Sequence, residues 1–155
     1  MSPRFTADPT ATSAVLFVPP KGEYEFEIGK PKAFQRTKKG GGESIGVMYM
    51  MAFADGQFKG KRNIYSCYTG SEGGLSYAKR FLMAALGFEI TQDDEEKFNQ
   101  EFKGKDWDFE TSTGECGDMW NEVAGKKVLA STDVRIAEDT GEQTLQWIGF
   151  RPVKS

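Results

Sequence analysis

Basic and aromatic side chains gather in one stretch of the sequence, from Lys30 to Arg62. The stretch contains eight lysines and arginines but only two acids, a net charge of +6. Such cations can neutralise phosphates, and aromatic faces beside them can stack on bases, each stacked base contributing about 1–3 kcal/mol. The combination is typical of a surface that binds single-stranded nucleic acid. The residues expected to form it, some just beyond the stretch, are Phe34, Arg36, Lys38, Lys39, Lys59, Lys61, Arg62, Tyr65, Tyr68, Trp147 and Arg151.

Residue type and strand register assign roles within this set. We expect phosphate contacts from five cations, Lys38, Lys39, Lys59, Lys61 and Arg62. Phe34 and Tyr65 are expected to stack on bases, and Tyr65 to be exposed because it alternates in register with Lys59 and Lys61. Tyr49 alternates with Ile45 and Val47 and is expected in the core.

Two structural alternatives stay open for the same residues. Trp147, on the last expected strand near Arg151, fits a core position as well as a stacking position. The loop RTKKGGG at 36–42 fits an ordinary solvated hairpin end as well as a phosphate-binding loop.

The residue types that most catalytic sites need are missing. The chain has no histidine, which excludes Ser-His-Asp and Cys-His catalysis and imidazole ligands. Cys67 and Cys116 form no CxxC pair, so neither a zinc site nor a disulfide is predicted. The acids at 93–96 lack the spacing of a calcium loop and fit the first turn of a helix. We therefore predict a non-enzymatic binding protein without metal or cofactor, and an enzyme using acids and a divalent metal is the least favoured class.

The small total charge hides a second, acidic region. The formal net charge is −3, yet residues 89–118 carry eleven acids against three lysines. Local fields steer ligands even when the net charge is near zero. This segment supports an alternative function: a protein-interaction module or inhibitor that acts through the acidic insert as a nucleic-acid mimic.

Length and hydropathy indicate one cytoplasmic domain. The 155 residues suit a single core, and the longest apolar run, 47–54, is too short for a membrane-spanning helix. Two unpaired thiols suit a reducing cytoplasm, and no membrane contact is expected. Residues 1–20, rich in Ser, Thr, Pro and Ala, are predicted to be a flexible arm. Residues 21–155 are predicted to form the domain, with 89–118 as an acidic insert. Its helix is expected to bury Phe98 and Phe102, and its second part, 103–118, to lie outside the core.

Alternation and turn residues predict the elements that would position these side chains. Strands are expected at 22–28, with an irregular continuation through Phe34, and at 44–53, 58–68, 128–136 and 144–153. Helices are expected at about 74–86, capped near Ser71 and ended by Gly87, after a cap at Thr91, and over 119–123. Five strands with a helix between the third and fourth favour a Greek-key barrel of the oligonucleotide-binding (OB) fold, which binds ligands across strands two and three.

Several sequence segments also resemble a known family. GEYEFEI, RTKKGGGES, FKGKRNIYSCYTG, LSYAKRFLMAALGF and MWNEVAGKKVLASTDVR are similar to segments of small phage single-stranded-DNA-binding proteins of the OB-fold kind. The resemblance runs from about Lys21 to Val153 and is interrupted by the acidic insert. It implies a protein that coats single-stranded DNA with low sequence specificity, as an accessory in phage DNA replication or recombination in the host cytoplasm. Replication or recombination proteins and further copies of the chain are candidate partners.

The chain departs from that family at its end. Many such proteins finish in an acidic tail that recruits partners, whereas this sequence ends Arg151-Pro-Val-Lys-Ser155. If a partner-docking acidic segment exists, the insert after Phe88 is the better candidate.

Overall fold

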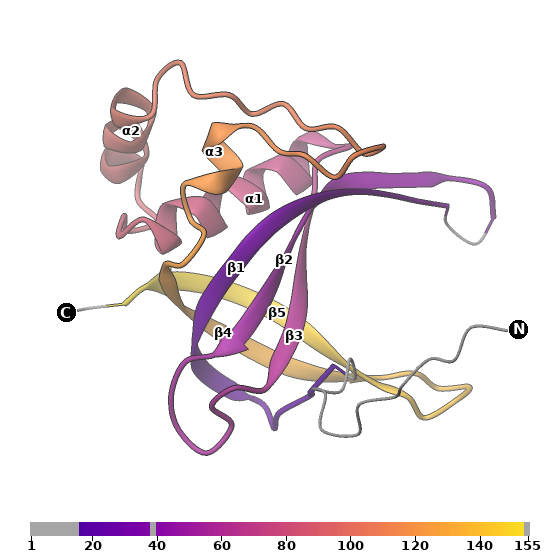
Figure 1. The fold of residues 1–155 in the computed structure, drawn as a ribbon. Coiled ribbons are helices and arrows are strands. Elements are labelled where there is room, and N and C mark those ends of the chain that lie inside the picture. The colour runs from indigo at the N-terminus through magenta and orange to yellow at the C-terminus, as the bar shows by residue number, and fades with distance from the viewer. Residues whose placement is uncertain (1–15, 38–39, 154–155) are drawn as a thin grey trace, which may run out of the picture.

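The chain is mainly β, built on one five-stranded antiparallel sheet. The computed structural model describes residues 16–37 and 40–153. Its strands are β1 (Gly22–Thr37), β2 (Glu43–Phe53), β3 (Arg62–Tyr68), β4 (Lys127–Ile136) and β5 (Gln143–Pro152). Helix α1 (Glu72–Ala85) lies between β3 and β4, followed by α2 (Gln92–Glu101) and the short α3 (Asp118–Asn121). The strand order is β3-β2-β1-β4-β5, with the helices gathered at one end of the sheet (Figure 1).

Strand β1 is the longest and holds the sheet together. Its first six residues, from Gly22 to Glu27, pair with β4, and most of its length pairs with β2, from Phe26 to Thr37. The register with β2 shifts between Ile28 and Pro31, which marks a bulge. Beyond the end of β3, β1 and β2 continue as a two-stranded arm that projects from the molecule (Figure 1).

The sheet is not closed into a barrel by backbone pairing. Strands β3 and β5 form its two edges, although the curvature brings them near each other. Their link is a side chain: the indole Nε1 of Trp147 on β5 donates a hydrogen bond to the carbonyl oxygen of Ile64 on β3 (3.1 Å). The predicted five strands and intervening helix are therefore present, but a fully hydrogen-bonded barrel is not.

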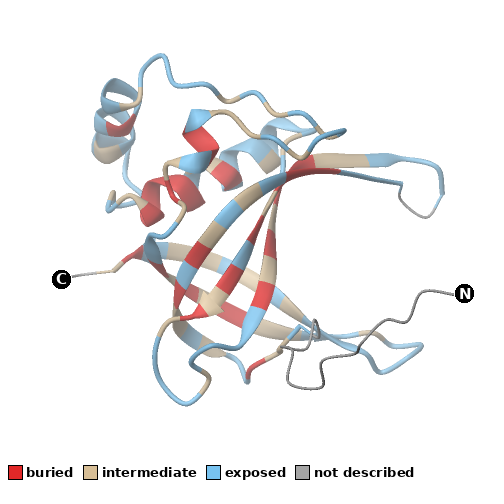
Figure 2. Cartoon of the chain, in the orientation of Figure 1, coloured by how far each residue is buried: buried red, intermediate tan, exposed pale blue. Residues whose placement is uncertain are grey.

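The core lies between the concave side of the sheet and α1. Alternate residues of the strands are buried, and α1 turns one buried face toward them (Figure 2). Ser71 caps α1 by accepting the backbone N–H of Gly74 (3.1 Å), and Thr91 caps α2 by accepting that of Asp94 (3.2 Å). Both predicted caps are confirmed, because short hydroxyl side chains satisfy the unpaired N–H groups of a first helical turn.

The insert is more tightly packed than its polar sequence indicates. Phe98 of α2 is buried, and Trp107 and Phe109 pack against the buried Trp120 of α3 at 5.5 and 6.4 Å between ring centroids. The prediction that the second half of the insert lies outside the core is therefore wrong. Aromatic residues spaced among its acids fold it back over the end of the sheet.

The beginning of the described chain is also packed. Phe17 lies against Phe53 and Phe58, and its N–H donates to the carbonyl oxygen of Arg62 (2.9 Å). The predicted arm thus ends earlier than Pro20, and its residues 1–15 lie outside the described part.

We expect Cys67 to resist thiol reagents in the folded protein. Its side chain is buried in the core, and burial raises the pKa of its thiol far above the usual range. Cys116 is half-buried, and burial raises its pKa as well, so it should react slowly. Titration with a chromogenic disulfide at pH 8 should therefore find one slow thiol in native buffer and two fast thiols in denaturant. Rapid reaction of both in native buffer would contradict this packing.

Candidate nucleic-acid interface

One face of the sheet formed by β1, β2 and β3 exposes apolar and basic side chains to solvent. Directly paired residues of an antiparallel sheet place their side chains on the same face. Val47, Tyr49 and Met51 point into the core, so their neighbours along β2 point outward. The register then defines an outer face made of Lys32, Phe34, Arg36, Ser44, Gly46, Met48, Met50, Ile64, Ser66 and Tyr68.

An aromatic row crosses this outer face. Phe34, Gly46 and Tyr68 are direct neighbours on β1, β2 and β3. A Cβ atom on Gly46 would lie 1.9 Å from the carbonyl oxygen of Cys67, so only glycine fits there. Because glycine has no side chain, Phe34 and Tyr68 meet across it edge to face, with ring centroids 5.8 Å apart. Tyr68 is 48% exposed, whereas Phe34 is only 5% exposed. The prediction that Phe34 stacks on bases is therefore wrong, because its ring is covered by its neighbours.

Arg36 completes this row with a positive charge. Its guanidinium carbon lies 4.9 Å from the centroid of the Phe34 ring, which accounts for part of the burial of that ring. A guanidinium on an aromatic face is held flat and keeps donors free for a phosphate. One of its nitrogens also contacts the sulfur of Met48 (3.8 Å), so Arg36 lies along the outer face rather than away from it.

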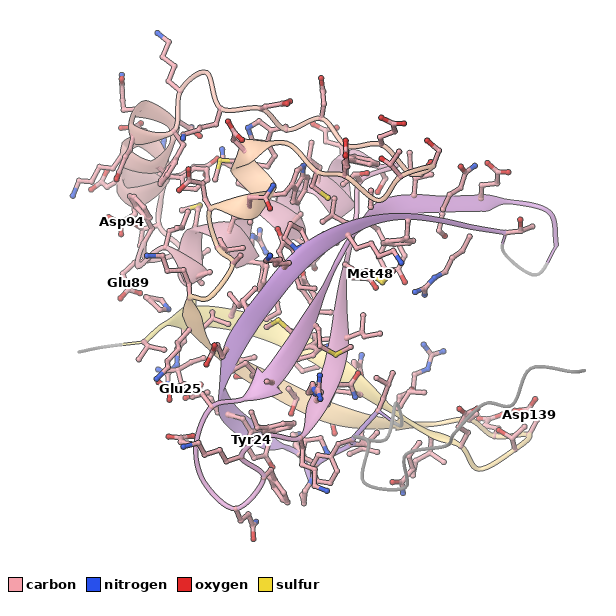
Figure 3. The ribbon with its side chains drawn as sticks, viewed as in Figure 1. Tyr24, Glu25, Met48, Glu89, Asp94 and Asp139 are labelled. Carbon is pink, nitrogen blue, oxygen red and sulfur yellow. The ribbon has the colours of Figure 1, made fainter. Side chains whose placement is uncertain are left out.

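An apolar strip continues from the row toward the middle of the sheet. Met48 and Met50 alternate on β2, and Ile64 pairs with Met50 from β3. Met50 is 39% exposed, and Figure 3 shows Met48 near the base of the β1–β2 arm. Lys32 pairs with Met48 from β1 and is exposed. Lys32 and Arg36 flank the thioether and aliphatic groups of the strip, and beyond Met50 the register adds one exposed acid, Glu27 of β1, which pairs with Ala52.

The predicted cations of the β2–β3 hairpin lie at the other end of these strands. Arg62 pairs with Ala52, six residues along β3 from the aromatic row, a separation of about 20 Å. Lys59 and Lys61 lie in the turn before β3, which begins four residues later than predicted because Gly60 and Lys61 bond back to Phe53. All three are exposed. Lys38 and Lys39, in the β1–β2 loop, fall outside the described residues.

Tyr65 is not part of the surface. The prediction of an exposed tyrosine is wrong: its side chain is 8% exposed, points inward, and packs on Phe81 and Phe150 with centroids 4.7 and 4.6 Å away. The alternation with Lys59 and Lys61 misleads, because those two residues precede the strand. Burial also raises the pKa of the Tyr65 hydroxyl far above its usual range.

Trp147 and Arg151 on β5 also lie away from the outer face. Trp147 packs on Phe26 and Tyr65 and is half-buried, so its ring serves the core while one side reaches a groove described below. Arg151 forms a two-point ion pair with Glu23 on β1, and its Nε–H donates to the Glu23 carboxylate (2.8 Å). That hydrogen bond holds the pKa of Glu23 below its usual value. The predicted binding set is therefore divided among three places.

An acidic turn borders the outer face along β1. Gly114 accepts the backbone N–H of Ala33 (3.0 Å), and the hydroxyl of Thr111 donates to Gln35 (3.4 Å). The same turn carries Glu110 and Glu115, joined by a backbone hydrogen bond of 2.8 Å and both exposed. The β1 side of the face is thus negative.

Sequence reasoning missed the residues that lie at the centre of this face. Lys32 lies in the basic stretch of the sequence, but the bulge after Ile28 resets the alternation and puts Lys32, Phe34 and Arg36 on one side. The outward position of Met48 and Met50 could have been predicted, since both alternate along β2 with the buried Val47 and Tyr49.

The described residues contain no group of acids and cysteines arranged to hold a metal ion. None of their helices is long and apolar enough to cross a membrane. Comparison of the chain with known protein families finds no match, and comparison with curated protein sequences finds no significant one.

Proposed function

We propose that this chain is a non-enzymatic protein that binds single-stranded DNA on the outer face. The observation that carries the proposal is the exposed ring of Tyr68, supported edge to face by the buried Phe34. Met48 and Met50 lie on the same face, which Lys32 and Arg36 flank. Flat apolar groups next to cations suit unpaired bases next to phosphates. A duplex hides its base faces, so the apolar strip gives it little to contact.

The strand arrangement supports a fold of the OB kind. The order β3-β2-β1-β4-β5 with α1 between β3 and β4 matches a five-stranded, partly open Greek-key barrel, and such folds bind single strands across strands two and three. The outer face covers those two strands. We therefore assign the chain to this fold as part of the same proposal.

The chemistry of the face favours binding without sequence preference. Thioether, aliphatic and aromatic groups contact any base, and the cations read only phosphate. A protein of this kind coats exposed single strands, which fits an accessory role in phage DNA replication or recombination, as the resemblance implies. Arg62, on the same side of β3 as Ile64 and Tyr68, would add a phosphate contact at the other end of that strand.

A salt titration tests this function directly. With a fluorescent oligo-dT, we expect the logarithm of the binding constant to fall by about 2 per tenfold rise in salt if Lys32, Arg36 and Arg62 each contact one phosphate. A duplex of equal length should bind more weakly at every salt concentration. Undetectable binding at about 50 mM salt, where charge neutralisation is strong, would refute the function. A preference for duplex would refute the assigned surface.

A further inference from the structure

We propose that the bound strand continues past the edge of β3 into a groove between β3, β5 and α1, an inference that rests on the proposed function. The groove has a volume of about 630 Å³ and lies where the two open edges of the sheet approach each other. The residues that carry the argument are Tyr68, Tyr77, Arg80, Trp147 and Ile148.

The groove offers the same chemistry as the outer face. Tyr77 on α1 is 63% exposed, and the guanidinium carbon of Arg80 lies 5.3 Å from the centroid of its ring. Ile148 on β5 is exposed opposite, and Trp147 forms part of the lining. Among the described residues that line the groove, Arg80 is the single charged one and none is an acid. An exposed aromatic ring under an arginine is suited to one base and its phosphate.

The groove is continuous with the outer face. Tyr68 belongs to both, since it ends the aromatic row and also lines the groove. At the opposite side of the row, the turn with Glu110 and Glu115 lies along β1 and would repel phosphates. A strand crossing the sheet along the row is therefore favoured to leave over β3 toward Arg80, not over β1.

The β3 edge of the groove is poorly suited to pairing with a polypeptide strand. Addition of a β-strand needs a run of free N–H and C=O groups on the edge. On β3, the Arg62 carbonyl is taken by Phe17, and both the N–H and the carbonyl of Ile64 are taken by side chains. Gly74 lies so close to the carbonyl of Tyr68 that a Cβ atom on it would be 2.2 Å away. These contacts leave β3 too short a free edge for a peptide. The exposed Tyr77 beside Arg80 fits a base and its phosphate, so we assign the groove to nucleic acid.

The test compares oligo-dT of increasing length on the intact chain. For the wild type, affinity should rise with length until face and groove are both filled. The Tyr77→Ala/Arg80→Gln variant should reach its plateau at a shorter length and bind long oligonucleotides at least about 20-fold more weakly at 0.1 M salt, since it loses one stacked base and one phosphate contact. The matched control is Leu75→Ala/Lys103→Gln, an exposed apolar residue of α1 outside the groove and an exposed lysine beyond α2.

A photocross-link gives the second readout. Oligonucleotides carrying 5-iododeoxyuridine should cross-link to Tyr77 when they are long and not when they fill the outer face alone. If the groove variant matches its control at every length and no cross-link maps to Tyr77, the inference is wrong while the proposed function stands. If the wild type binds no oligonucleotide of any length, the proposed function itself fails. Capture of a peptide by the groove with unchanged DNA binding would also overturn the inference.

Discussion

Replacing Lys32 and Arg36 together by glutamine is expected to weaken binding of oligo-dT about 25-fold at 0.1 M salt. Each cation that contacts a phosphate on a single strand releases counterions, and contributes about 0.7 to the slope of log K against log salt. Two lost contacts should therefore lower the slope by about 1.4, and the loss of affinity should shrink as salt approaches 1 M. The slope identifies lost charge contacts, which a general loss of folding would not.

The control for this variant is a second pair of exposed cations of the same types. Lys103 lies beyond α2, and Arg135 lies near the β4–β5 turn. The Lys103→Gln/Arg135→Gln variant has the same net charge as the test variant, so any difference in binding between the two does not come from overall charge. We expect it to keep the wild-type slope. Equal slopes for both variants would show that phosphates are not held by the outer face.

Arg36 packs on Phe34 as well as carrying a charge, so its replacement by glutamine has two effects. Its guanidinium lies over the ring, and loss of that cover exposes an apolar face. An Arg36→Lys variant keeps the charge but loses the planar group. It should retain most of the salt slope and lose a smaller part of the affinity, which would separate the charge of Arg36 from its packing.

The elements could be predicted because each carries a strong local signal. Tyr24, Phe26 and Ile28 alternate with glutamates in the first strand, and the structure has a strand there that pairs on both sides. Ser71 and Thr91 lie where hydroxyl caps are expected. Local signals of this kind depend on neighbouring residues alone, so one sequence suffices to read them.

The face of a residue could not be read wherever the register shifts. The bulge between Ile28 and Pro31 changes the side of every later residue of β1, and a one-residue slip has that effect on any strand. The late start of β3 places Lys59 in a turn and Tyr65 in the core. Both errors come from extending an alternation across a break in the backbone.

Long-range packing was equally invisible in the sequence. Tyr65 is buried because Phe81 of α1 and Phe150 of β5 close over it, and no spacing within β3 indicates those partners. Arg151 is held by Glu23, a residue 128 positions away. The groove between β3 and β5 likewise exists because the sheet curves and stays open, a property of the whole chain.

Replacing Trp120 by alanine is expected to lower the free energy of unfolding by about 3–5 kcal/mol, the usual cost of truncating a buried tryptophan. Trp120 is fully packed between the sheet and the insert, and its indole N–H donates to the carbonyl oxygen of Trp107 (2.7 Å). The Tyr49 hydroxyl donates to the backbone carbonyl of Trp120 (2.7 Å), so the same residue joins β2 to the insert. Urea denaturation followed by circular dichroism measures the change.

Trp107→Ala is the matched control, because Trp107 is half-buried and its backbone carbonyl survives the substitution. It should lower the free energy of unfolding clearly less than Trp120→Ala does, and an equal loss would contradict the anchoring role of Trp120.

Trp120→Phe separates stability from binding. It keeps a ring in the core but leaves the Trp107 carbonyl without its donor, which lowers the free energy of unfolding by about 1–3 kcal/mol. Because the outer face lies on the opposite side of β2 from Tyr49, the folded Trp120→Phe variant should bind oligo-dT with the wild-type salt slope.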